Sequence, residues 1–243
     1  MKLVDFLAKL QKAEGEKTLY VNGCFGAPMT AANKKRYTTN TSYNKQPERT
    51  KKINAATDHT FGFDCVCLIK GILWCWTGDA TKQYGGAVYK SNGVPDFSAT
   101  SAITYCTKTS NDFRGIVPGA LLWMTGHVGI YLGNGLAIEC TPNWKDGVQT
   151  TAVGNIGKIW GYETRTWKMW GLLPWVEYQE EKLPDGVEMV EMDVKSSKVN
   201  GVVRVPAINL DGRWYVQLRA FDTIMGVASV DYDESKKRPK IID

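Results

Sequence analysis

Cysteine and histidine are the residue types in this chain that together could carry out nucleophilic catalysis. The chain has six cysteines but only two histidines, His59 and His127, so a thiol that needs an imidazole base has few partners. A thiolate attacks carbonyl carbons, and a nearby imidazole can take the proton from the thiol and later protonate the leaving group. The surroundings of each cysteine therefore decide which thiol is placed to react.

Cys65 has the setting expected of a reactive thiol. It follows Asp64, a good helix N-cap, and precedes an apolar run with helical spacing, which predicts a buried helix that begins at Cys65. The apolar positions are Leu68, Ile69, Ile72 and Leu73. Backbone N–H groups and the positive end of the helix dipole favour the thiolate there and could stabilise an oxyanion. Without a base nearby, Cys65 would be only a small residue of the core.

The other five cysteines lack this setting. Cys67 is expected to face another side of the same helix, and Cys75 is expected deep inside it. Cys24, Cys106 and Cys140 have no comparable position. No pair of cysteines has the two-residue gap of a zinc knuckle, and without a secretory signal a disulfide framework is not expected. We therefore predict free thiols, no metal and no organic cofactor.

His127 opens a segment that predicts a β-hairpin. The residues after it alternate as a strand, Gly133-Asn-Gly135 provides the turn, and a second strand follows. With a three-residue loop, Gly129 pairs with Glu139, and His127 lies diagonally beside Glu139 on one face. A two-residue loop would turn Glu139 to the opposite face. We adopt the three-residue loop because a glycine at its end suits a left-handed conformation.

This register predicts a catalytic triad. His127 would deprotonate Cys65, or hold it as a thiolate–imidazolium pair. Glu139 would accept the other imidazole N–H and fix the tautomer. Asn143, just beyond the second strand, is the alternative orienting residue. His59 fits no part of this arrangement and is assigned to the surface or to a substrate loop.

Five short motifs accompany these residues. Two of them carry the reactive side chains, Phe63-Asp-Cys65 and Gly126-His-Val-Gly-Ile-Tyr-Leu-Gly-Asn-Gly135. The others are Leu19-Tyr-Val-Asn-Gly23, Val117-Pro-Gly-Ala-Leu-Leu-Trp123 and Trp170-Gly-Leu-Leu-Pro-Trp175. This set, which spans roughly residues 1–178, resembles the NlpC/P60 superfamily of papain-like cell-wall peptidases, and most of all its phage and prophage lysin branch.

The resemblance implies a fold, a substrate class and a set of roles. The fold would be α+β and papain-like, with the helix that carries Cys65 packed on an antiparallel sheet that carries His127. The enzyme would cleave peptidoglycan stem peptides, most often between D-Glu and a diamino acid, through a Cys65–His127–Glu139 triad and an acyl-enzyme. Tyr20 would lie near the thiol and position substrate or an oxyanion, with Asp64 as a second residue of this kind.

The chain departs from the family motifs at several positions. Val66 and Cys67 stand where the family usually has Ser and Gly. Cys24 replaces the second glycine of the Tyr motif, and Ala120 replaces an Asp. The third triad position is commonly His, Asn or Gln, but here it is Glu139. Three alternatives therefore stay open: an N-acetylmuramoyl-L-alanine amidase with the same triad, a non-catalytic wall-binding protein on a decayed scaffold, and a thiol acyltransferase or deamidase.

The composition places these motifs in an ordinary globular protein. The chain has 243 residues, of which 43% are hydrophobic and 23% charged, enough for one sizeable domain and a small one. Residues 3–10 predict an amphipathic first helix rather than a signal peptide. No apolar stretch is long enough to span a membrane. We expect cytoplasmic synthesis and action on the wall after release, as for a phage lysin.

A charged stretch at residues 179–186 predicts a linker between a catalytic domain, residues 1–178, and a small β-rich module, residues 187–243. The elements predicted for the module are hairpin turns at Asn200-Gly201 and Asp211-Gly212, a short helix at 219–225, and strands near 228–232 and 240–242. It resembles the small βα modules named after the N-terminal domain of copper amine oxidases. Because it contains neither His nor Cys, we expect a wall-binding or spacer role without copper.

The positive charge of the chain lies in its first part. Residues 187–243 hold equal numbers of basic and acidic residues, so the net charge of +5 belongs to residues 1–186. Between Lys34 and Lys52, seven basic residues accompany one acid, Glu48. We interpret this polar segment as a solvated loop. The alternative is attraction of this segment, or of the C-terminal module, to anionic wall polymers; no aromatic ladder supports a nucleic-acid partner.

Overall fold

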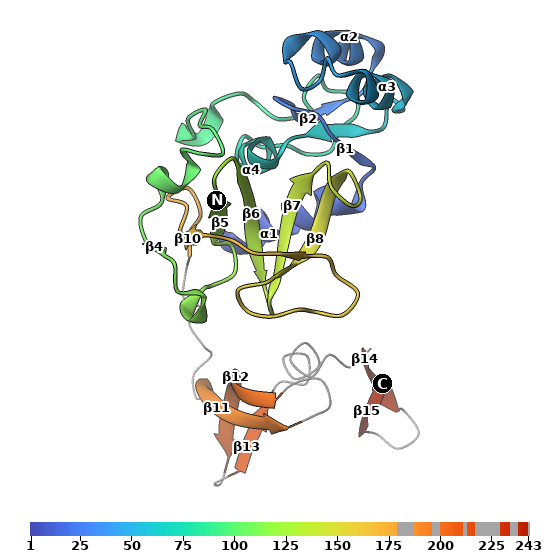
Figure 1. Ribbon diagram of the computed structural model, residues 1–243. Helices are drawn as coiled ribbons and strands as arrows, with labels where there is room; N and C mark the ends of the chain where they lie inside the picture. Colours follow the sequence, from blue (N-terminus) through green and yellow to red (C-terminus); the bar gives the residue numbers. More distant parts are fainter. Residues whose placement is uncertain (179–186, 196–199, 211–212, 217–228, 234–237, 243) are drawn as a thin grey trace. The chain divides into compact units, whose positions relative to one another are not determined.

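The computed structural model describes residues 1–178, 187–195, 200–210, 213–216, 229–233 and 238–242. The chain divides into two units, Met1–Tyr178 and Gln179–Asp243. The first unit combines helices with two sheets and belongs to the α+β class (Figure 1). No helix in the described ranges has both the length and the apolar character needed to cross a lipid bilayer.

A seven-stranded sheet forms the centre of the first unit. Its order is β4-β10-β5-β6-β7-β8-β9, and all neighbours are antiparallel except β8 and β9. The strands are β4 (Thr109–Ser110), β5 (Leu121–Met124), β6 (His127–Gly133), β7 (Leu136–Thr141), β8 (Gly147–Val153), β9 (Thr164–Arg165) and β10 (Met169–Gly171). Along β6, Val128 and Ile130 enter one hydrophobic cluster and Tyr131 enters another, so both faces of the sheet are buried.

Two helices pack on one face of this sheet. Helix α4 (Cys65–Leu73) lies against β6 and β7, and α1 (Leu3–Gly15) lies against α4 and β8 (Figure 1). The buried residues of α1 are Phe6, Leu10 and Ala13, which confirms the predicted amphipathic helix. Every residue of α4 is buried, as expected for an apolar helix in a core.

The end of α4 differs from the prediction. The helix ends at Leu73, and Cys75 is exposed with a left-handed φ of 70°. The prediction that Cys75 lies deep in the helix is therefore wrong. Trp74 and Trp76, on either side of it, are both buried. The left-handed backbone at Cys75 ends the helical path between these two buried rings.

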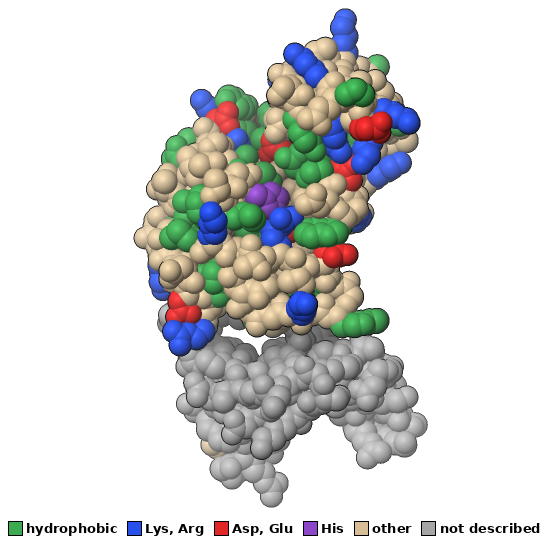
Figure 2. Space-filling model, in the orientation of Figure 1, with side chains coloured by type: hydrophobic (Ala, Val, Ile, Leu, Met, Phe, Trp, Pro, Cys, Tyr) green, Lys and Arg blue, Asp and Glu red, His purple; other side chains and the backbone are tan. Residues whose placement is uncertain are grey.

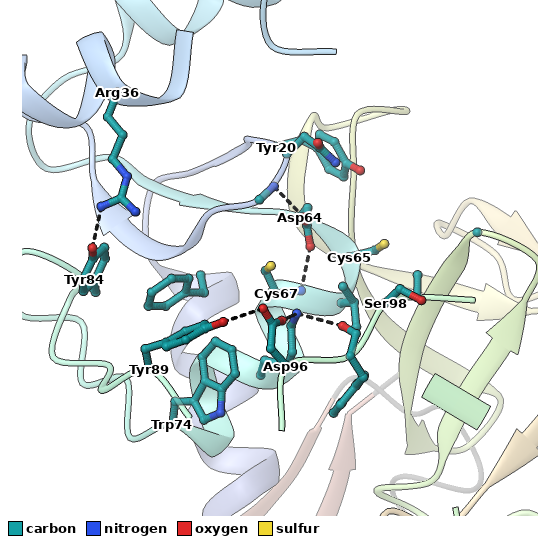
Figure 3. Close-up of a pocket in the computed structure, with 18 residues that line it drawn as sticks. Tyr20, Arg36, Asp64, Cys65, Cys67, Trp74, Tyr84, Tyr89, Asp96 and Ser98 are labelled. Carbon is teal, nitrogen blue, oxygen red and sulfur yellow. Dashed lines mark hydrogen bonds and ion pairs between the residues drawn. The ribbon is translucent and has the colours of Figure 1, made fainter. Parts of the chain in front are cut away.

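A smaller sheet lies next to the start of α4. Its order is β1-β3-β2, with β3 parallel to β1 and antiparallel to β2. The strands are β1 (Thr18–Tyr20), β2 (Phe25–Pro28) and β3 (Phe61–Phe63). Strand β3 leads through Asp64 directly into α4, and β1 ends at Tyr20, so both strands deliver side chains to the same region (Figure 3).

The basic segment between Lys34 and Lys52 is helical. It contributes most of α2 (Ala31–Asn40) and α3 (Pro47–Ala55), whose Lys and Arg side chains project from that end of the unit (Figure 2). The predicted solvated loop is therefore wrong. Thr30 caps α2, and a proline opens α3. Each helix buries only two residues, four apart, which is too few to give the apolar stripe by which a helix is recognised.

The β6–β7 hairpin places Glu139 as predicted, by a different route. The two strands are joined by two residues, Asn134 and Gly135, both with positive φ. The predicted three-residue loop is therefore wrong. A bulge at Leu132 shifts the register by one residue. This shift cancels the effect of the shorter loop and returns Glu139 to the face of His127.

The second unit contains two described groups of strands. They are an antiparallel sheet of β11 (Val187–Lys195), β12 (Asn200–Leu210) and β13 (Arg213–Val216), and an antiparallel pair of β14 (Ser229–Asp233) and β15 (Arg238–Ile242). Leu210 pairs with Arg213, as the predicted Asp-Gly hairpin requires. Asn200 and Gly201 pair with Lys195 and Val194 at the end of the ladder, so the predicted turn at Asn200-Gly201 is wrong. The helix predicted at 219–225 lies outside the described residues.

Candidate active site

A pocket of about 780 Å³ opens at the start of α4, and Cys65 lines it (Figure 3). Tyr20 reaches it from β1, and Gly126, the residue before β6, lies at its border. Its aromatic wall consists of Phe25, Trp74, Tyr84, Tyr89 and Phe97. The pocket therefore joins the predicted nucleophile to the end of the strand that carries His127.

Burial at the start of α4 disfavours the thiolate form of Cys65. The residue is 5% exposed, and its sulfur and that of Cys67 point to different sides of the helix start (Figure 3). Burial, and then the negative charge of Asp64, raises the pKa of the Cys65 thiol to about 12, although the backbone N–H groups of Val128 and Val66 act in the opposite direction. The backbone N–H groups at the helix start thus favour the thiolate, as predicted, but burial and Asp64 outweigh them, and Cys65 needs a base.

His127 and Glu139 form the contact that the hairpin register predicts. Nε2 of His127 lies 2.6 Å from Oε2 of Glu139, whose side chain is fully buried. Glu139 also accepts hydrogen bonds from Thr151 Oγ1 at 2.7 Å and from Arg165 Nε at 2.8 Å. Burial alone would raise the pKa of Glu139, but the hydrogen bonds from His127 and Arg165 outweigh it, so this pKa lies below its ordinary 4.5.

These contacts fix the tautomer of His127. Glu139 is ionised at neutral pH, and a carboxylate accepts hydrogen bonds without donating them. Nε2 of His127 therefore carries a proton, and Nδ1 keeps the lone pair that a general base needs. The imidazole also stacks on the indole of Trp167, with ring centroids 5.6 Å apart and an interplanar angle of 12°. The hydrogen bond to Glu139 and the stacking on Trp167 therefore both fix the orientation of the imidazole.

Cys65 and His127 lie at the same end of β6 but are not hydrogen-bonded. The thiol lies against the backbone N–H of Val128, the residue that follows His127. Among the residues that the structure describes, no hydrogen bond joins the sulfur to the imidazole. Catalytic hydrogen bonds are often long before substrate binds and shorten in the complex. Transfer of the thiol proton to Nδ1 therefore requires such a closure.

The chain was compared with known proteins at three levels. No family model, curated protein or solved structure matches it. Its function is therefore inferred from the geometry of the site and from the motifs of the sequence.

Two other residues considered from the sequence lie elsewhere. The carbonyl of Asn143 accepts a hydrogen bond from Gln149, and in the described part of the chain Asn143 makes none with His127. The side chain of His59 is 82% exposed and belongs to the surface. Of the two candidate orienting residues, it is Glu139 that contacts the imidazole.

Tyr20 and Asp64 offer a substrate different groups. Burial, and then the nearby Cys65, raises the pKa of Tyr20, so its hydroxyl stays protonated and can donate beside the thiol. Asp64 Oδ1 accepts the N–H of Cys67 at 2.6 Å, and Oδ2 accepts that of Gly23 at 2.7 Å. Because both oxygens are already used as acceptors, we assign Asp64 to holding the helix start and the Gly23 turn.

Asp64→Ala is expected to lower the stability of the first unit by about 1 to 2 kcal/mol, because it removes the N-cap of α4. The loss of the Gly23 contact adds to this effect. Urea unfolding followed by tryptophan fluorescence would measure the change. Asp58→Ala is the control, because the side chain of Asp58 is 72% exposed. It should unfold at the same urea concentration as the wild type. Coincident unfolding curves for all three proteins would contradict the capping role.

The rate of alkylation distinguishes a protonated thiol from a preformed thiolate. All six cysteines are free, and Cys75 is exposed. Iodoacetamide at neutral pH is expected to modify Cys75 before Cys65, and the rate at Cys65 should rise throughout the range from about pH 7 to about pH 10, because its thiol pKa is about 12. Peptide mass spectrometry would follow both sites. Rapid, pH-independent modification of Cys65 would instead indicate a thiolate–imidazolium pair.

Arg165 is the part of the site that the sequence patterns do not indicate. It donates from Nε to both oxygens of Glu139, at 2.9 and 2.8 Å. Strand β9, which carries it, has only two residues and pairs in parallel with β8, so no local periodicity marks it. The available signal is charge: a buried carboxylate requires a cation, and Arg165 is the sole arginine between Arg114 and Arg204.

The pocket wall also carries a buried cation. Lys70 is 4% exposed; its ammonium group forms an ion pair with Asp96 and donates to the carbonyl of Phe97 at 2.8 Å. Asp96 accepts a second hydrogen bond from Tyr89 at 2.8 Å. Arg36 donates to the hydroxyl of a further wall residue, Tyr84 (Figure 3). This combination of charges and aromatic rings suits a polar, peptide-like ligand better than an apolar one.

Proposed function

We propose that this protein is a cysteine hydrolase that cleaves peptide bonds of peptidoglycan through Cys65, His127 and Glu139. The observation that carries the proposal is the 2.6 Å contact between His127 and the buried Glu139, at the end of β6 where Cys65 also lies. This contact leaves Nδ1 as the basic atom of the imidazole. A protonated thiol and an oriented base are the two components that thiol-based acyl transfer requires.

The reaction begins when His127 Nδ1 takes the proton of Cys65. The sulfur attacks the scissile carbonyl carbon, and the oxygen that becomes negative is stabilised by the Tyr20 hydroxyl and by backbone N–H groups at the start of α4. The imidazolium protonates the leaving amine as the C–N bond breaks, which leaves a thioester. His127 then takes a proton from water, which attacks the thioester and releases the acid, and the thiol is restored.

The substrate class comes from the motif resemblance to NlpC/P60 peptidases. The order and packing of the elements agree with a papain-like arrangement, because α4, which carries Cys65, precedes β6 and β7 and packs against both. The proposed bond lies within the stem peptide, between D-Glu and a diamino acid. The amide between muramic acid and L-alanine is the second candidate for the same triad. Release by a lysin-type route would bring the protein to the wall.

A zymogram on purified cell walls tests the hydrolase. The wild type is expected to clear the walls within the range of about pH 5 to pH 8, in which an imidazole base works. Absence of clearing at every pH would sink the proposal. Mass spectrometry of the products would separate the two bonds, since an endopeptidase leaves an amine within the stem peptide and an amidase releases the stem peptide whole.

One observation favours a wall-binding protein without catalysis. The thiol pKa is raised to about 12, and within the described residues no hydrogen bond connects Cys65 to His127. Under this alternative the protein would sediment with sacculi but release no fragment. Transfer of the cleaved acyl group to an added amine, instead of water, would indicate an acyltransferase.

A further inference from the structure

Trp144 is the outermost member of a stack of planar side chains that ends at the imidazole of His127. Its ring centroid lies 4.9 Å from Cζ of Arg165, which in turn lies 5.7 Å from the ring centroid of Trp167. The ring of Trp167 stacks on His127. Trp144 is 46% exposed, whereas Trp167 is 2% exposed. The stack therefore exposes the indole of Trp144 to solvent, and only Arg165 and Trp167 lie between it and the imidazole of His127.

The backbone holds Trp144 in an unfavourable conformation. Its φ is 55°, in the left-handed region that bulky side chains rarely enter. The short loop between β7 and β8 that contains it is clamped by Asp146, which pairs with Arg49 at 2.7 Å and with Lys52 at 2.6 Å, both from α3. Strain of this kind persists where surrounding contacts impose it, and it is concentrated at functional sites. A glycine or asparagine would fit this backbone conformation better. The presence of tryptophan here is therefore explained by its ring and not by its backbone.

The exposed indole of Trp144 is an uncharged aromatic surface. Arg165, which the ring covers, is paired with Glu139, and Asp146 pairs with both Arg49 and Lys52 of α3. One face of the ring covers the guanidinium of Arg165. The rest of the ring, in a residue that is 46% exposed, offers an aromatic surface to a ligand. Such a face packs against the C–H side of a sugar ring through dispersion and weak C–H contacts.

We propose that Trp144 forms a glycan subsite that binds the C–H face of an amino-sugar ring of peptidoglycan. This inference rests on the proposed function, because the glycan strand carries the stem peptide as a substituent on its sugars. The ring itself carries no charge, so the apolar face of a sugar matches it better than the charged groups of an anionic polymer do. The subsite holds the strand while Cys65 and His127 act on the attached peptide.

Trp144→Gly tests the subsite with two substrates, a stem peptide still attached to its sugars and the same peptide without them. The ratio of kcat/KM for the first to that for the second is expected to fall about tenfold, through KM. Glycine suits a φ of 55°, so the variant should fold at least as well as the wild type. A purely structural role, exerted through Arg165 and Glu139, would lower both rates and leave the ratio unchanged, which would overturn the subsite.

Trp160→Ala is the matched control, since Trp160 is 98% exposed and takes no part in the stack. It should leave the ratio unchanged, and an equal fall in this variant would also overturn the subsite. A binding measurement separates this test from that of the hydrolase. Peptide-free glycan strands should quench the tryptophan fluorescence of Cys65→Ala, and Cys65→Ala with Trp144→Gly should lose this response. If the glycan strands do not quench the fluorescence, the glycan subsite is refuted. If they quench it but the wild type cleaves no peptide bond, only the proposed hydrolase activity is refuted.

Discussion

Replacement of Cys65 by alanine is expected to lower the rate of wall hydrolysis by a factor of about 10⁴ or more, which in most assays is complete loss. The sulfur is the atom that forms the acyl-enzyme, and alanine has nothing to replace it. The fold should survive, because alanine is smaller than cysteine and the Asp64 cap of α4 bonds to the N–H of Cys67. Release of soluble fragments from labelled sacculi, with circular dichroism as a check on folding, would measure the effect.

Cys67→Ser is the matched control for this variant. Cys67 is on the same helix, two residues from Cys65, and lines the same pocket, but its sulfur points to another side (Figure 3). Serine conserves its size, so most of the activity should remain. If Cys67→Ser lost activity and Cys65→Ala kept it, the thiol would have been assigned to the wrong residue.

His127→Ala is expected to lower kcat by a factor of about 10³, because the protonated thiol of Cys65 loses its base. The pH dependence of the remaining activity gives a sharper test. With a thiol pKa of about 12, the thiolate fraction grows about tenfold for each pH unit, so the residual rate should rise in the same proportion from about pH 7 to about pH 9. A pH-independent residual rate would show that another group activates Cys65.

Glu139→Gln is expected to reduce activity less than His127→Ala does, because the imidazole remains although its tautomer is no longer fixed. It also leaves Arg165 without a carboxylate, which should cost about 3 kcal/mol of stability. Kinetics and urea unfolding of the two variants together would separate these effects. Unchanged activity in a folded Glu139→Gln protein would remove Glu139 from the mechanism.

The lowered pKa of Glu139 has a consequence for acid unfolding. A carboxyl group whose pKa is lower in the folded state stabilises that state when ionised. For Glu139 this contribution is complete above its ordinary pKa of 4.5 and is lost as the pH falls through the lowered value. The stability difference between the wild type and Glu139→Gln should therefore narrow below about pH 4.

Local patterns were sufficient for the elements that carry the reactive groups. The start of α4 follows from an N-cap and an apolar run that are adjacent in sequence, so Asp64 and Cys65 could be placed without knowledge of the fold. The contact of His127 with Glu139 follows from hairpin pairing, which is also a short-range property. The register was predicted correctly although the loop was not, because a bulge compensates for the shorter loop.

Contacts between distant segments account for what the sequence did not indicate. Arg165 is 26 residues from Glu139 and reaches it through a two-residue strand. Burial sets the state of the Cys65 thiol, and the depth of burial depends on packing that no local pattern gives. Helix α3 buries Arg49 against Asp146, which is 97 residues away in the sequence. In a sequence without the fold, such an arginine is indistinguishable from a solvated one.

Analysis of the peptides released from purified sacculi, by liquid chromatography and mass spectrometry, tests the central claim most directly. The wild type is predicted to produce stem-peptide fragments that carry one added water at a hydrolysed peptide bond, and Cys65→Ala is predicted to produce none. Fragments formed equally by both proteins, or by neither, would contradict the assignment of Cys65 as the nucleophile of a peptidoglycan hydrolase.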